Sequence, residues 1–255
     1  MDEFAAAYLS GIVSISLGNP LEVWKTRIQA NAQRGPILQT PALGVALPIL
    51  GYGALNAILF SSYAGTLRTL EGVEMGVGRE WTAGAVAGVC TFVISAPTEL
   101  IKCRAQVSGV NSWQTLKSVY QSMGVTGLYY GGVITVARDS IGYGFYFWSY
   151  AWMKSSFVLE GDVGKALATF VSGGIAGCVT WASIYPLDVV KTRYTTQTQP
   201  LLSPLYASAT ACARSMFAEH GAGVFFRGIG ITMVRSFFVN AVQFLVYESA
   251  KRLMH

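Results

Sequence analysis

Long apolar stretches alternate with short polar segments along the whole chain. Three of these stretches run over residues 47–66, 133–153 and 229–251, and another apolar segment precedes each of them. Because about 20 apolar residues are enough to cross a bilayer as a helix, the pattern predicts six membrane-spanning helices. Shorter amphipathic segments near 112–123 and 206–219 predict two helices that lie between paired spans.

The composition supports a membrane protein and excludes several other classes. The chain has 255 residues, of which 52% are hydrophobic and 12% are charged, whereas soluble domains carry about 25% charged residues. A net charge of +5 suits anionic lipids or solutes, but the charges are scattered, so we expect no nucleic-acid partner. Four cysteines form no CxxC pair and only two histidines are present. We therefore expect no enzyme activity, no metal site and no cofactor.

One short motif occurs three times. A proline is followed two residues later by an acid, and three residues after the acid by a lysine. The prolines are Pro20, Pro97 and Pro186, the acids are Glu22, Glu99 and Asp188, and the lysines are Lys25, Lys102 and Lys191. This recurrence predicts one domain, 1–255, made of three two-helix repeats: residues 1–76, 77–160 and 161–255.

The motif has a physical explanation in a helical bundle. Proline removes a backbone hydrogen bond and kinks a helix, so three kinks would bring three helix ends together. The acid and the lysine lie three residues apart and therefore share one face. Charges inside a membrane face partners or a water-filled cavity, and three of each can form a ring of pairs between helices that acts as a gate. In the alternative, each acid pairs with the lysine of its own helix.

These residues resemble the mitochondrial carrier family (solute carrier family 25), whose motif is PX[DE]XX[KR]X[KR]XQ. The resemblance covers nearly the whole chain and implies an all-α, multi-pass carrier of the mitochondrial inner membrane, with six transmembrane helices around a central cavity. It implies a matrix gate of three pairs, which are Glu22 with Lys102, Glu99 with Lys191, and Asp188 with Lys25. Gln29 and Gln106 match the glutamine braces of that gate, and Thr195 stands in the third brace position.

The chain departs from the family in two places. Of the cytoplasmic gate pattern [FY][DE]xx[KR], only the copy with Glu248 and Lys251 is complete, while the fourth helix keeps Lys154 without its acid. The first repeat is also short: 23 residues separate Lys25 from Pro48, against 33 from Lys102 to the equivalent Thr135. Its matrix helix is therefore expected to be truncated, as in a diverged carrier, a splice variant or a protein that no longer transports.

The resemblance also implies a solute site on the even-numbered helices. The three contact points align with Gly51, with Arg138 and Asp139, and with Arg235. This combination resembles the amino-acid and carnitine/acylcarnitine branch or its orphan relatives, and implies antiport or transport of a small zwitterion or cation. An arginine can hold a carboxylate and Asp139 an ammonium group. In the alternative, Arg138 and Asp139 neutralise each other or neighbouring helices.

Aromatic residues and lipids complete the predictions. Trp181 or Tyr143 could add a cation–π contact to the solute, although packing is the alternative for the tryptophan. Trp24 suits either the floor of the cavity or a lipid-facing position. Arg227 and Gly228 open a helix and match the family's cardiolipin sites, so we expect cardiolipin as a structural lipid and a monomeric protein.

Overall fold

The computed structural model describes residues 13, 18–30, 46–73, 78–156, 162–197, 205–236 and 239. Within these residues the regular structure is helical and no strand is found. The elements are α2 (Ala46–Thr69), α3 (Gly78–Cys90), α4 (Phe92–Ser108), α5 (Ser112–Leu128), α6 (Gly132–Ser156), α7 (Asp162–Thr195), α8 (Ala209–His220) and the short 3-10 helix η2 (Ala222–Phe226). Residues 18–29 and 229–236 are also helical. The prediction of an all-α protein is confirmed.

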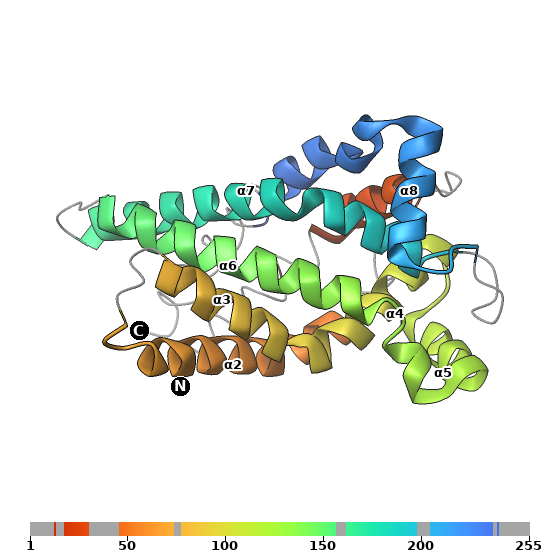
Figure 1. The fold of residues 1–255 in the computed structure, drawn as a ribbon, viewed down its shortest axis with the longest axis horizontal. Coiled ribbons are helices and arrows are strands. Elements are labelled where there is room, and N and C mark those ends of the chain that lie inside the picture. The colour runs from red at the N-terminus through yellow and green to blue at the C-terminus, as the bar shows by residue number, and fades with distance from the viewer. Residues whose placement is uncertain are drawn as a thin grey trace.

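Helices α2, α3, α6 and α7 lie alongside one another, and helices α5 and α8 lie at one end of this bundle (Figure 1). Residues 18–30, drawn in red, lie at that same end. Two of the three long apolar stretches, which are the second spans of their repeats, lie fully in the described residues. Both coincide with helices: 47–66 lies in α2, and 133–153 lies in α6. Of 229–251, the structure describes helix 229–236.

The two amphipathic segments also form helices, and each packs on the motif helix of its own repeat. α5 covers Leu100 and Ile101 of α4, which form a buried cluster with Val119. α8 and η2 cover Val190 of α7, which lies in a cluster with Met216 and other buried residues. The corresponding connection of the first repeat, residues 31–45, lies outside the described residues, so the predicted truncation of its matrix helix remains a prediction.

The bend in the second repeat lies before the proline of the motif. α3 and α4 meet at Thr91 with an angle of 64°, whereas Pro97 lies inside α4 and Pro186 lies inside α7. The proline ring clashes with the carbonyl group four residues earlier, which is that of Val93, directly after the bend. That carbonyl accepts a hydrogen bond from the Tyr129 hydroxyl at 3.1 Å, so it keeps a partner.

Length and hydropathy can be compared directly with those of a membrane span. In the described part of the chain, no single helix is both long and apolar enough to cross a bilayer by these criteria. The bent pair of α3 and α4 passes them when its two halves are taken together. The six-span arrangement therefore stays a prediction.

Small residues allow α3 and α6 to approach closely. A Cβ atom at Gly88 would lie 2.5 Å from the backbone oxygen of Asp139, and one at Gly84 would meet the backbone of Tyr143. Neither backbone can move without displacing α6, so these two glycines set the distance between the helices.

We predict that Gly88→Ala lowers the stability of the folded protein by about 1–3 kcal/mol, the usual cost of overpacking. The matched control is Gly53→Ala on α2, where an added Cβ atom meets nothing within 4 Å. Thermal unfolding in mild detergent measures both variants. A melting temperature that falls equally in the two variants would show that helix approach at Gly88 is not the cause.

Candidate functional site

Six side chains from three helices form a ring of ion pairs between helices. Lys102 Nζ lies 2.7 Å from Glu22 Oε1, which joins α4 to helix 18–29. Lys25 Nζ lies 2.7 Å from Asp188 Oδ2 and joins helix 18–29 to α7.

The pair Lys191–Glu99 closes the circle between α7 and α4. We call the six residues Glu22, Lys25, Glu99, Lys102, Asp188 and Lys191 the charge ring. All three predicted pairs are in contact, and each joins two different helices rather than two turns of one helix.

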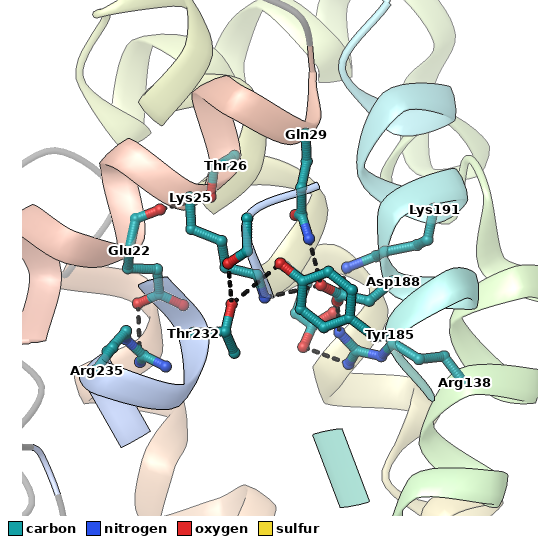
Figure 2. Close-up of polar contacts among 12 residues, drawn as sticks. Glu22, Lys25, Thr26, Gln29, Arg138, Tyr185, Asp188, Lys191, Thr232 and Arg235 are labelled. Carbon is teal, nitrogen blue, oxygen red and sulfur yellow. Dashed lines mark hydrogen bonds and ion pairs between the residues drawn. The ribbon is translucent and has the colours of Figure 1, made fainter. Parts of the chain in front are cut away.

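Two arginines from other helices bind the acids of the charge ring. Arg138 of α6 contacts Glu99 Oε1 at 2.6 Å and Asp188 Oδ1 at 3.2 Å. Arg235 of helix 229–236 contacts Glu22 Oε2 at 3.2 Å, and Figure 2 shows both arginines pointing at the ring. Each acid of the ring is therefore shared between one lysine and one arginine.

Asp139 adds a fourth acid to this layer. Its carboxylate contacts the guanidinium of Arg138 and accepts a hydrogen bond from Ser95 Oγ at 2.9 Å, which links α6 to α4. Arg138 thus binds three carboxylates, as the alternative of mutual neutralisation predicts. Among the described residues the layer holds five cations and four anions, which leaves one positive charge in excess.

The two predicted glutamine braces occupy different environments. Gln29 Nε2 donates to Asp188 Oδ2 at 3.0 Å, directly beside the pair that Asp188 makes with Lys25 (Figure 2). Gln106 instead bonds to Thr26 Oγ1 at 2.9 Å and to Asn19 Oδ1 at 3.4 Å. It therefore ties α4 to helix 18–29 through neutral groups.

The second basic residue of the motif holds the helix ends together. Arg27 Nε donates to the carbonyl oxygen of Gln106 at 3.1 Å, and Arg104 Nε donates to that of Thr195 at 2.8 Å. These two contacts are equivalent under the repeat, since each runs from one motif helix to the brace position of the next. The third such base, Arg193, lies 3.7 Å from Glu219 of α8.

The other residues predicted to contact the solute are Trp181, Tyr143 and Gly51, and each of them contacts another part of the protein. Lys25 Nζ lies 4.1 Å from the centroid of the Trp181 indole. One face of this indole is therefore covered by a cation of the charge ring. Tyr143 packs beside Leu59 and Phe147. A Cβ atom at Gly51 would lie 3.5 Å from Ile94 of α4, which places this glycine at a contact between helices.

The cytoplasmic gate and the lipid site remain predictions. Glu248 and Lys251 lie outside the described residues, and so does the side chain of Lys154. Gly228 has a φ of +88°, and the carbonyl of Arg227 accepts a hydrogen bond from Tyr185 at 3.1 Å. The exposed Arg227 side chain is compatible with an anionic lipid but identifies none.

Sequence reasoning missed three polar residues that support the layer. Ser95 bonds Asp139, Thr26 bonds Gln106, and Tyr185 joins α7 to Thr232 at 3.2 Å. Two of them lie within two residues of a motif proline, and Thr26 follows the motif lysine directly. A comparison of the residues that flank the three motifs could have singled them out.

The ion pairs of the charge ring lie at one level of a helical bundle and join its helices in a closed cycle. Such a charged layer is expected in a protein that opens and closes a central passage. The mitochondrial carrier protein family model matches residues 73–161 and 162–255. The chain belongs to the mitochondrial carrier family.

Its relatives are similar over nearly their full length. Solute carrier family 25 member 48 of Mus musculus is 29% identical over 288 residues, which covers 97% of this chain and 94% of the relative. The mitochondrial basic amino acids transporter of Mus musculus is 32% identical over 267 residues, covering 95% and 86%. The mitochondrial arginine transporter BAC2 of Arabidopsis thaliana is 32% identical over 274 residues, covering 99% and 91%.

We predict that the Glu22–Lys102 pair is energetically coupled. In a double-mutant cycle with Glu22→Gln and Lys102→Gln, the coupling should be about 1–3 kcal/mol, because the two charges are mostly shielded from water. Thermal unfolding of the four proteins measures it.

The control cycle uses Arg193 and Glu219. The Ser215 hydroxyl, which donates a hydrogen bond to Glu219, together with Arg193 lowers the pKa of that carboxyl, so it is ionised at neutral pH. Glu219 is solvent-exposed, so this pair should show no measurable coupling. Equal coupling in both cycles would contradict a special role for the charge ring.

Proposed function

We propose that the protein carries a small amino acid, with basic amino acids as the first candidates, across the mitochondrial inner membrane by alternating access. The observation that carries this proposal is the charge ring, whose acids are each shared with an arginine. Relatives that are named for basic amino acids and for arginine support the amino-acid part of the prediction over the carnitine part. The complete ring favours a working carrier over one that has lost transport.

The partners of the two arginines suggest how a solute would act on the gate. Arg235 makes one contact with Glu22, and its buried Nε has no hydrogen-bond partner in the described part of the chain. Arg138 is already bound to three carboxylates. A solute carboxylate would therefore bind first to Arg235, because its Nε–H group is still free to donate a hydrogen bond.

Binding of that carboxylate would weaken the charge ring at one position. A carboxylate on Arg235 competes with Glu22, whose other partner is Lys102. It also neutralises the one positive charge that the layer holds in excess. The ammonium group of the solute would replace Arg138 as the partner of Asp139, since among the described residues Asp139 is the acid of the layer that contacts no lysine. Binding and opening are then linked, because each solute charge replaces a contact that keeps the helices together.

Uptake of labelled arginine, lysine, neutral amino acids and carnitine into proteoliposomes tests the proposal. We expect uptake of at least one amino acid, and we expect Arg235→Gln to reduce it roughly tenfold or more, because a charge-assisted hydrogen bond is worth about 1.5–3 kcal/mol. Asp139→Asn should reduce uptake of solutes that carry an ammonium group.

The matched control is Arg214→Gln, at an exposed position on α8, which should leave uptake unchanged. An equal loss in Arg214→Gln and Arg235→Gln would count against the site. A folded protein that transports none of these solutes would favour the alternative prediction of a carrier fold without transport.

A further inference from the structure

The hydrogen bond between Ser95 and Asp139 joins two helices inside the charged layer. Ser95 Oγ of α4 donates to Asp139 Oδ2 of α6 at 2.9 Å, and the two residues are 4% and 5% exposed. The other carboxylate oxygen, Oδ1, accepts a hydrogen bond from Arg138 Nε at 2.9 Å. The two oxygens of this carboxylate therefore have different partners, one neutral and one charged.

Three features of the second repeat bring the Ser95 hydroxyl to this carboxylate. Gly88 lets α3 approach α6 closely, since a Cβ atom there would lie 2.5 Å from the backbone oxygen of Asp139. The chain then bends by 64° between α3 and α4. Ser95 lies in the first turn after this bend, where its backbone N–H donates to the carbonyl oxygen of Thr91 at 2.9 Å. The backbones of both helices thus fix the position of the hydroxyl.

The other two repeats do not form an equivalent pair. Ser95 precedes the motif proline by two residues, a position that holds Gly18 and Ile184 in the other repeats, and neither has a side-chain donor. Ser236 takes the place of Asp139 in the third repeat, and its buried Oγ has no hydrogen-bond partner in the described part of the chain. A solute site built on the pair in the second repeat would therefore hold a solute in one orientation relative to the three repeats.

The contacts of Arg138 and Asp139 allow one partner to be exchanged. Arg138 is also bound to Glu99 and Asp188, so it keeps two carboxylates when it leaves Asp139. Asp139 keeps the hydrogen bond from Ser95, and Oδ1 is the oxygen that is released. An ammonium group can bind to a single oxygen, whereas the planar fork of a guanidinium binds best to two oxygens side by side. The released oxygen therefore favours an ammonium group.

We propose that Ser95 is a positioning residue that holds Asp139 in place, so that the released oxygen meets the α-ammonium group of an amino acid. Without the hydroxyl, the carboxylate of Asp139 would be free to rotate and to stay with Arg138. The hydroxyl acts through Asp139 and does not itself bind the solute. This inference rests on the proposed function, and it adds a residue that selects solutes with an ammonium group.

The test measures uptake of labelled arginine, lysine and neutral amino acids into proteoliposomes that contain variants at Ser95. Ser95→Ala should raise the KM roughly tenfold with little change in kcat, because a hydrogen bond to a charged group is lost. Ser95→Thr keeps a hydroxyl and should have a KM close to that of the native chain. If the alanine variant does not fold, Ser95→Cys replaces it, because a thiol is a weak donor of similar size and should raise the KM in the same direction.

Competition with a matched pair of unlabelled solutes gives a second measurement. The pair is the transported amino acid and its analogue without the α-ammonium group. The native chain should bind the amino acid more tightly than the analogue, and Ser95→Ala should lose most of this preference. A purely structural role of the hydroxyl would leave the preference unchanged, and that result would overturn the proposal.

The matched control is Ser149→Ala. Ser149 of α6 is 2% exposed, and its hydroxyl donates to the carbonyl oxygen of Phe145 on the same helix at 2.6 Å, so this variant should keep the native KM. An unchanged KM in Ser95→Ala, or an equal rise in both alanine variants, would overturn the proposal while leaving the proposed function intact. A native chain that takes up no amino acid would overturn the proposed function and this inference together.

Discussion

The structure depends on keeping each of nine charged side chains in contact with an opposite charge, in a layer that is mostly shielded from water. An isolated charge in such an environment is costly, and removal of one partner of a buried pair typically costs about 3–5 kcal/mol. Lys25, Asp188 and Lys191 are each at most 6% exposed. The helices that carry these residues must therefore stay together for as long as the charges have no other partner, and this requirement closes the bundle at that level.

The same requirement makes the closure reversible. The acids of the charge ring are each held by a lysine on one motif helix and by an arginine on another helix. Such shared contacts can be exchanged one at a time, because a carboxylate that loses Arg235 still keeps Lys102. A packed hydrophobic seal would have to separate over its whole area at once. The polar layer thus provides a gate that can respond to a charged solute.

The main pairs of the site could be predicted from the sequence because the motif is repeated. Three copies at equivalent places predict a ring of ion pairs between helices. The resemblance to the carrier family then assigns each acid to the lysine of one particular neighbouring helix. The contact of Arg138 with Asp139 was one of two alternatives that the sequence left open. Its particular partners on other helices, Glu99 and Asp188, could not be assigned, since they depend on how far α6 lies from α4 and α7. The covered face of Trp181 was missed for the same reason, because Lys25 reaches it from a different helix.

The fold likewise has features that the sequence predicted and features that it did not. Hydrophobic length located α2 and α6 closely, and the amphipathic pattern located α5 and α8. The position of the bend at Thr91 was not predictable from Pro97 alone, because the clash of a proline acts on the preceding turn and the neighbours decide where the strain is relieved. Similarly, the different partners of Gln29 and Gln106 could not be predicted from the motif, because the neighbouring helix offers each glutamine an acid and a threonine at equivalent positions.

The most direct test of the central claim is the distance between the ends of helix 18–29 and α4 in the membrane. Spin labels at Ala30 and Ser108, in a chain whose four cysteines are replaced, report this distance by pulsed electron paramagnetic resonance. The account predicts one short distance without solute and a second, longer population when a transported amino acid is added. A single short distance, unchanged by a solute that measurably stabilises the protein, would contradict a gate that opens through exchange of these ion pairs.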